Sequence, residues 1–303
     1  MFSIFAADAM TTNLLQPIRT SILIVLLISL AACAQQFPRP VDLPSDSNGP
    51  SAAEIFARSF DAHGGERLDE FDDLSVALDG KWKFLITRIQ PLVTDHKYRV
   101  QSEERLLPQS GVYTASYRGP DGTKQVIRTP DSVRVFYNGE ESFDEDVLQS
   151  TALTADAFFV FTIGPLALGE SRDDFQRLED GVDKGKRYYR LYAVLEPGFG
   201  YADRDEIVLW IDPETFLTYR IHITLEGYDT TKGAHVDVTF LDYEQRGDFV
   251  LPSRYLERVL GPIRIKAHRW QLTGLDINRG FSLADIEGPD YVGRAADPAK
   301  QLP

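Results

Sequence analysis

The sequence predicts a mainly β protein with a few helices, built around a strongly curved antiparallel sheet. Alternating apolar and polar residues recur between turn signals over most of the chain, which is typical of strands with one buried face. A one-sided apolar helix precedes these strands, and an apolar segment at residues 155–170 interrupts them. Many antiparallel strands with a single wet face curl rather than stay flat, so we expect the helix and this segment to cover the concave side.

The N-terminal region indicates export and attachment to a membrane. An apolar run at 21–34 follows Arg19, and it is shorter than the about 20 residues that a membrane-spanning helix needs. The motif "LAAC" at 30–33 resembles the bacterial lipobox, at which lipoproteins are acylated and cut. The resemblance implies that residues 1–32 are a signal peptide and that Cys33 is the lipid anchor.

Cys33 is the only cysteine of the chain, so it has no disulfide partner in an exporting pathway. The following stretch is rich in Pro, Ser and polar residues, and we expect residues 33–50 to form a tether. Ala34 after the cysteine favours, by the same resemblance, the periplasmic face of the outer membrane. An ordinary signal peptide with an accidental cysteine is the alternative. Both Met1 and Met10 are plausible starts.

Composition limits the remaining choices. Residues 51–303 are enough for a single domain, which we expect to hold all the strands. The net charge of −14 argues against a nucleic-acid partner, because no basic stripe is available to neutralise phosphates. It also argues against electrostatic docking on anionic lipid.

The first elements follow from capping and periodicity. Ser51 and Glu54 form a capping box, and Gly64 and Gly65 end the helix that begins there. From Leu74 to Ile86 the even positions are almost all apolar, which predicts one long strand that carries Trp82, Phe84 and Ile86 on its buried face.

A later hairpin allows its register to be predicted. Matching the apolar faces of its two strands places Leu225 opposite Val236 and Ile221 opposite Phe240. The buried faces are then expected to hold Tyr219, Ile221, Ile223, Val236, Val238 and Phe240.

The segment 155–170 is too broken for a strand of this sheet and too apolar for a solvated loop. It carries Phe158, Phe159 and Phe161, with Gly164 and Pro165 in its middle. We expect it to lie in the mouth or interior of the curved sheet. Two interpretations stay open, namely a movable plug over a cavity and a part of a solid core.

Four features together resemble the family of outer-membrane lipoprotein-sorting proteins of the LolA and LolB type. They are "AHGG" at 62–65, the long first strand, "VLWIDPETFLTYRI" at 208–221 and "HRWQLTGLDIN" at 268–278. The resemblance implies a half-open antiparallel β-barrel wrapped around helices, with an apolar cavity that shields acyl chains. The chain departs from the soluble carrier by having its own anchor, so holding a ligand at the membrane is expected rather than shuttling.

The predicted function is therefore the binding of an acyl chain or another hydrophobic ligand, with no covalent chemistry, no cofactor and an unknown protein partner. The expected lining of the cavity consists of Trp82, Phe84, Ile86, Phe158, Phe159, Phe161, Tyr219, Ile221, Ile223, Val236, Val238 and Phe240. A scaffold that binds an envelope partner is one alternative, and an envelope hydrolase is another.

The patterns of common catalytic motifs are absent from the sequence, and no metal site is expected. His222 and His235 fall on the polar face of the predicted hairpin. In the predicted register His235 faces Glu226 and His222 faces Thr239, so the imidazoles lie apart and the face is solvated. His63, at a helix end, is expected to be structural.

Overall fold

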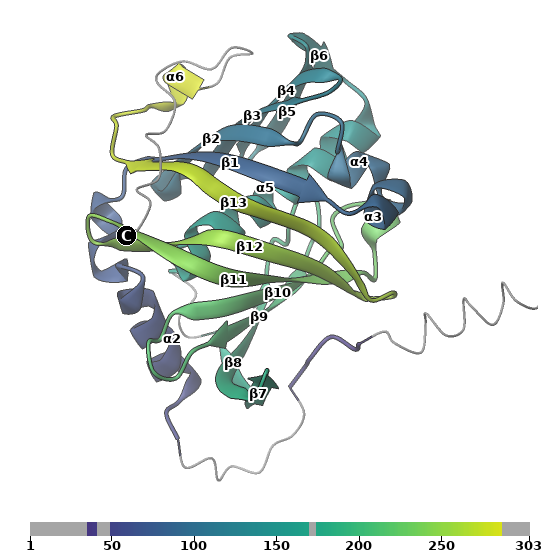
Figure 1. The fold of residues 1–303 in the computed structure, drawn as a ribbon. Helices are drawn as coiled ribbons and strands as arrows, with labels where there is room; N and C mark the ends of the chain where they lie inside the picture. The colour runs from purple at the N-terminus through teal and green to yellow at the C-terminus, as the bar shows by residue number, and fades with distance from the viewer. Residues whose placement is uncertain (1–34, 41–48, 170–173, 287–303) are drawn as a thin grey trace, which may run out of the picture.

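The computed structural model describes residues 35–40, 49–169 and 174–286 (Figure 1). The predicted signal peptide and the anchor Cys33 lie outside the described residues, as do residues 41–48 of the predicted tether. Residues 35–40 were expected to be part of the tether, but Gln35, Phe37 and Arg39 contact the folded body.

Within the described residues thirteen strands form one antiparallel sheet, which confirms the predicted fold class. Their order in the sheet is β6-β5-β4-β3-β2-β1-β13-β12-β11-β10-β9-β8-β7, so β6 and β7 are open edges and the barrel is not closed. The strands are β1 (Leu74–Trp82), β2 (Gln101–Leu107), β3 (Val112–Gly119), β4 (Gly122–Thr129), β5 (Ser132–Tyr137), β6 (Glu140–Ser142), β7 (Gln176–Asp183), β8 (Lys186–Leu195), β9 (Asp205–Ile211), β10 (Thr218–Thr224), β11 (His235–Arg246), β12 (Phe249–Gly261) and β13 (Ile265–Ile277).

Helices occupy the concave side and the two ends of the sheet (Figure 1). They are α2 (Ala52–Ala62), α3 (Phe84–Ile89), α4 (Pro91–Thr94), α5 (Glu145–Ile163) and α6 (Leu283–Ile286), with 3₁₀ turns η1 (Gly65–Glu70), η2 (Pro108–Ser110), η3 (Gly164–Leu168) and η4 (Asp229–Thr231). We call the end where β1 meets α3 the α3 end. The β8–β9, β10–β11 and β12–β13 connections lie there too, as the ladders show.

The capping box of α2 is confirmed. The Ser51 hydroxyl accepts from the Glu54 amide at 3.2 Å, and the Glu54 carboxylate accepts from the Ser51 amide at 2.7 Å. Two orphan amides at the helix start are thereby satisfied. The apolar face of α2 buries Ile55, Phe56 and Phe60 against the core.

The prediction that one strand reaches Ile86 is wrong, because β1 ends at Trp82 and α3 begins at Phe84. The amide of Lys83 makes a final ladder bond to Ala267, and the Thr87 hydroxyl then bonds back to the Phe84 carbonyl within the helix. Partner strand β13 begins at Ile265, so few partners remain for a longer β1.

The apolar segment that begins at residue 155 forms the second half of α5 and then η3. Figure 1 shows α5 behind the sheet, on its concave side. Its apolar side chains point in most directions and are buried, so this helix has no single apolar face. The span Glu145–Leu168 is long and apolar enough to cross a membrane, but 78% of its window is buried inside the fold, as is usual for a core helix.

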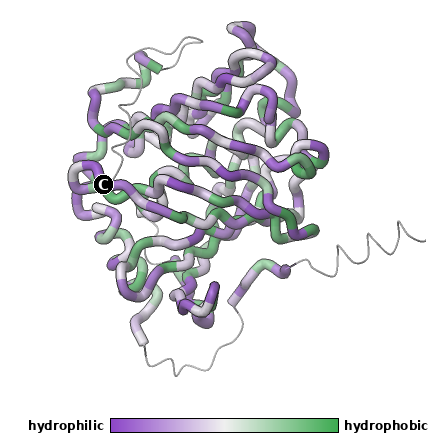
Figure 2. The backbone as a smooth tube through the Cα atoms, viewed as in Figure 1, coloured by the Kyte–Doolittle hydropathy of each residue, from purple (hydrophilic) through white to green (hydrophobic). Residues whose placement is uncertain are grey.

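The hydropathy of the strands alternates along most of the sheet (Figure 2). This pattern separates a large core on the concave side from a smaller cluster on the convex side, which contains Phe37, Tyr188 and Trp210. Both faces therefore bury apolar side chains near β8, β9 and β10.

Candidate ligand-binding site

Most of the predicted lining residues do meet on the concave face of the sheet. They pack against α5, and all belong to one buried core, namely Ile221, Ile223, Val236, Val238, Phe240, Phe158 and Phe161. Ile86 is buried in the same core from α3, whereas Trp82 and Phe159 are partly buried at its margin. The helix α5 thus fills the trough that the sequence predicts.

Two predicted lining residues lie elsewhere. Phe84 is 73% exposed, because it sits on the outer side of α3 and not on a strand. Tyr219 points to the convex face, since the β9–β10 ladder shifts between Thr218 and Arg220 and this bulge reverses the alternation. The ring of Tyr219 stacks on Tyr188, with 4.2 Å between the ring centroids.

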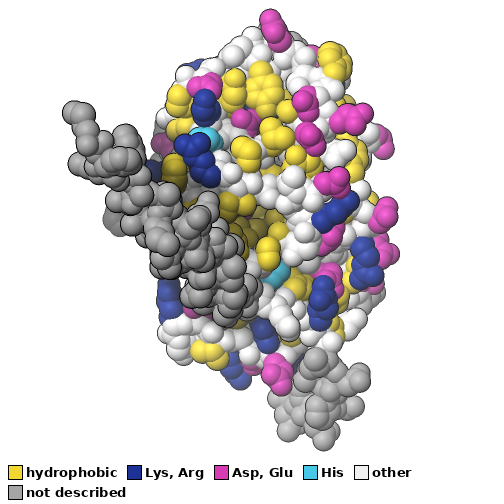
Figure 3. All heavy atoms as spheres, turned by 90° about the vertical axis from the view of Figure 1, so that its right-hand side faces the viewer, with side chains coloured by type: hydrophobic (Ala, Val, Ile, Leu, Met, Phe, Trp, Pro, Cys, Tyr) yellow, Lys and Arg dark blue, Asp and Glu magenta, His cyan; other side chains and the backbone are white. Residues whose placement is uncertain are grey.

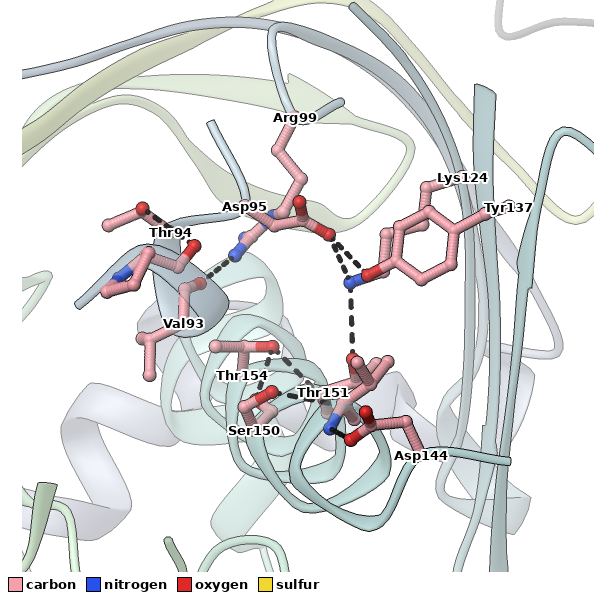
Figure 4. Close-up of polar contacts among 12 residues, drawn as sticks. Val93, Thr94, Asp95, Arg99, Lys124, Tyr137, Asp144, Ser150, Thr151 and Thr154 are labelled. Carbon is pink, nitrogen blue, oxygen red and sulfur yellow. Dashed lines mark hydrogen bonds and ion pairs between the residues drawn. The ribbon is translucent and has the colours of Figure 1, made fainter. Parts of the chain in front are cut away.

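Buried polar contacts fasten α5 to the sheet at one point that Figure 4 shows. The Lys124 ammonium donates to Asp95 at 2.8 Å and to the Thr151 hydroxyl of α5 at 3.2 Å. The Tyr137 hydroxyl donates to the same Asp95 oxygen at 2.7 Å. Burial lowers the pKa of Lys124, and the carboxylate of Asp95 opposes this effect.

A second polar fastening lies further along α5. Arg128 of β4 grips Asp156 with two bonds of 2.8 and 2.9 Å. Asp156 also accepts the Gly200 amide at 2.7 Å, which ties the β8–β9 connection to the helix. Gly200 has φ +63 and packs its Cα against Leu153, a close approach that a side chain would block.

A polar cluster lies beneath α5 around a cavity of about 20 Å³, close to the size of one water molecule. The guanidinium of Arg99 donates to the Val93 carbonyl at 2.9 Å and lies 4.7 Å from the ring centroid of Phe158. Burial raises the pKa of Glu104 to about 7, although bonds from Ser102 and other neighbours oppose this. Burial likewise raises the pKa of Glu257 to about 7.

His268 completes this cluster and stacks on Trp82, with 3.8 Å between ring centroids. Neither ring nitrogen has a hydrogen-bond partner within the described residues, and burial lowers the pKa of His268 well below its usual value. The Ser102 hydroxyl donates to Glu104 at 2.8 Å rather than to this imidazole. No serine–histidine relay is therefore formed in this part of the chain.

A larger cavity, of about 900 Å³, opens at the α3 end beside β7, β8 and the β8–β9 connection. Its apolar walls include Leu168, Phe175 and Phe199, which are themselves members of the buried core under α5. Polar groups, among them Glu196 and Arg204, make up the larger part of its exposed lining. Cavities of roughly 300–1,000 Å³ are typical of small-molecule sites in proteins.

The predicted register of the β10–β11 hairpin is wrong by two residues. Ile221 pairs with Val238 and Ile223 with Val236, because the connection turns earlier than expected, at Leu225 and Ala234. The apolar faces still match, since a slip of two residues keeps each side chain on its face. The histidines, however, become neighbours.

His222 and His235 are buried on the convex face, and the prediction that this face is solvated is wrong. Their Nε2 and Nδ1 atoms lie 2.8 Å apart, so one imidazole donates to the other. The ring of Phe37 covers both, with centroid distances of 4.6 Å to His222 and 5.7 Å to His235. Burial lowers the pKa of both histidines, and the nearby Arg220 contributes at His222.

Two further contacts hold the segment 35–40 across the sheet. The Gln35 amide donates to the Leu260 carbonyl of β12 at 2.9 Å. Arg39 reaches Glu206 of β9 with bonds of 2.9 Å from Nε, and Tyr192 donates to the same carboxylate at 2.5 Å. The sequence signal that was missed is a lone aromatic, Phe37, in an otherwise polar stretch.

His63 has the structural role that was predicted, for a different reason. Its side chain is fully buried, its Nδ1 donates to the Val250 carbonyl at 2.7 Å, and its Nε2 accepts from the Thr218 amide at 3.1 Å. Burial lowers the pKa of His63 to about 4, so the ring is neutral. Within the described residues no group of three or more metal-ligating side chains comes together.

No family model matches the sequence, and no curated protein matches it. Solved structures with a similar fold include a LolA superfamily protein from Nitrosomonas europaea, with 9% identity and a TM-score of 0.48 over 78% of this chain and 98% of that one. A DUF1329 family protein from Desulfovibrio piger has 10% identity and a TM-score of 0.44 over 78% and 98%. A putative outer membrane lipoprotein-sorting protein domain from Vibrio parahaemolyticus has 12% identity and a TM-score of 0.37 over 74% and 95%. The family expected from the sequence thus appears among these structures as a likeness of fold alone.

Proposed function

We propose that this protein is an envelope lipoprotein that holds an acyl chain or another hydrophobic ligand, with no covalent chemistry. In this proposal residues 1–32 are removed, and the acylated Cys33 anchors the chain at the periplasmic face of the outer membrane. The lipobox motif supports the anchor, and the names of the similar structures fit an envelope location.

One observation carries the proposal of a hydrophobic ligand. The cavity of about 900 Å³ shares Leu168, Phe175 and Phe199 with the core, so a ligand there continues the apolar interior beneath η3 and α5. Each Å² of apolar ligand surface removed from water contributes about 25 cal/mol, and no specific polar contact is needed. A longer chain would extend toward the concave lining as α5 moves outward.

The polar fastenings of α5 fit a cover that moves. The apolar side chains of α5 hold it in the core, and an outward movement of α5 would exchange the bonds from Lys124 and Arg128 for bonds to water. The helix α5, as the cover, is therefore held in its closed position by two polar contacts that can be broken and formed again.

Mass spectrometry of the mature protein purified from native membranes tests the proposal. We expect a bound fatty molecule, and an Ala167→Phe variant that narrows the cavity should retain less of it. Ala62→Phe is the matched control, since Ala62 is also partly buried against the core but does not line the cavity. A wild-type protein that carries no lipid and takes up no fluorescent fatty acid would contradict the proposal.

A further inference from the structure

Exposed apolar side chains gather at the α3 end of the sheet, in a group that we call the apolar tip. Figure 3 looks onto this end and shows hydrophobic side chains among charged ones. Five of the nine exposed large hydrophobic side chains in the described chain lie in or beside α3 and α4, namely Phe84, Leu85, Ile89, Leu92 and Val100. Apolar side chains that cluster on a surface in this way mark an interaction site.

Basic side chains lie beside the apolar tip, although the protein as a whole is acidic; Asp229 of the β10–β11 connection also lies at this end, where it pairs with Lys232. The stretches 80–94 and 259–275 contain no acidic residue. They lie side by side, because β1 pairs with β13 and Lys81 stands opposite Arg269. These two stretches carry six exposed basic side chains that form no ion pair within the described residues. They are Lys81, Lys83, Arg88, Arg264, Lys266 and Arg269.

The chain enters the fold next to this surface. The Gln35 amide is bonded to Leu260, at the end of β12 and just before the turn that carries Arg264. Cys33 lies two residues earlier, and two residues span at most about 7 Å. Under the proposed function, acyl chains on Cys33 would therefore lie within that distance of Gln35, which is held beside the turn that carries Arg264.

We propose that the apolar tip and its six cations form a membrane-seating surface, which contacts a bilayer that contains anionic phospholipids. The anchored form of this proposal rests on the acylation of Cys33 under the proposed function. Side chains such as Phe84 and Leu85 enter the boundary between headgroups and acyl chains, while the lysines and arginines lie at the phosphates.

The charge pattern favours a bilayer over a protein partner or a second copy of this chain. Another copy is acidic overall, but its own tip is basic, so two tips repel each other. A headgroup layer offers many phosphates at one level, and each cation near it strengthens binding about fivefold. The proposal departs from the expectation that the net charge argues against docking on anionic lipid, because the stretches 80–94 and 259–275 carry positive charge locally.

Seating at this end also orients the cavity. The β8–β9 connection that lines the cavity lies at the α3 end, as do the tip and Gln35. A lipid then passes between bilayer and cavity with little exposure to water.

Site-specific fluorescence on the mature protein, reconstituted in vesicles of phosphatidylethanolamine and phosphatidylglycerol, tests the proposal. A Phe84→Cys variant labelled with an environment-sensitive dye should show a blue shift and quenching by brominated lipid. Adding Lys83→Gln and Arg88→Gln should lower the equilibrium constant for seating about 30-fold. Replacing phosphatidylglycerol with phosphatidylcholine should lower it as well.

Val182→Cys is the matched control. Val182 is 68% exposed and stands opposite Arg187 on the β7–β8 hairpin, at the opposite end of the sheet. Equal responses at positions 84 and 182, or no response at 84, overturn the proposal. A response at 84 that needs a high protein concentration and no vesicles indicates contact between copies and also overturns it.

Dye labelling of the wild-type protein distinguishes a failure of this proposal from a failure of the proposed lipid anchor. If the wild-type Cys33 thiol reacts with the dye, acylation has failed and the proposed anchoring is wrong. The unanchored protein is then sedimented with the vesicles. Binding that depends on Phe84 and on phosphatidylglycerol supports the seating surface, and its absence overturns it.

Discussion

The imidazoles of His222 and His235 are joined by a hydrogen bond of 2.8 Å beneath the ring of Phe37. The two residues come from neighbouring strands, and Phe37 comes from the stretch that precedes the folded domain in the sequence. This contact connects the protonation of the convex face to the position of the N-terminal segment.

Acidification is expected to release the segment 35–40 from the sheet. Burial lowers the pKa of His222 and His235. Their neutral forms therefore favour docking of the segment at pH values above about 6.5, the ordinary pKa of histidine. This contribution to docking is lost as the pH falls below that value. Hydrogen exchange of the peptide that contains Phe37, corrected for intrinsic rates, should be faster at pH 5 than at pH 7.5. In a His222→Gln/His235→Gln variant the difference should shrink, and equal protection of the wild type at both pH values would contradict the prediction.

Glu104→Gln is expected to become progressively more stable than the wild type as the pH rises from 4.5 to above 7. Burial raises the pKa of Glu104 in the folded state to about 7, so the wild type loses stability as this carboxyl ionises. The glutamine of the variant does not ionise, so its stability is free of this loss. The difference should grow by about 3 kcal/mol over that range. Urea unfolding at several pH values measures it, with the half-exposed Glu103→Gln as the control for the change in charge.

Lys124→Met should loosen the cover. The substitution removes the donor to Asp95 and Thr151, and loss of one partner of a buried pair costs about 3 kcal/mol. Amides of α5 near Thr151 should exchange faster, whereas Lys184→Met on the exposed β7–β8 turn should leave them unchanged. Unaltered exchange in α5 would show that this fastening does not hold the helix.

Phe161→Ala should destabilise the domain by about 4 kcal/mol, because Phe161 is 2% exposed in the core between α5 and the sheet. Phe143→Ala is the matched control and should change stability little, since Phe143 is 79% exposed. Thermal or urea unfolding distinguishes the two. Similar losses for both variants would argue against a packed α5.

Local rules in the sequence determined the fold class and most strands. Period-two alternation, turn residues and the capping box of Ser51 and Glu54 depend on neighbours within a few residues, so they are legible without the structure. The concave position of Ile221, Val236 and Phe240 followed from alternation alone. The resemblance of "LAAC" at 30–33 to a lipobox is likewise local, and it stays a prediction.

The tertiary structure decided what depends on contacts far apart in the sequence. The bulge that turns Tyr219 outward and the turn that brings His222 to His235 are set by the partner strands and not by the hairpin's own alternation. The docking of Phe37, the filling of the trough by α5 and the basic apolar tip at α3 likewise arise where distant segments meet. A sequence pattern reports which side chains avoid water, whereas only the packed chain determines which of them find one another.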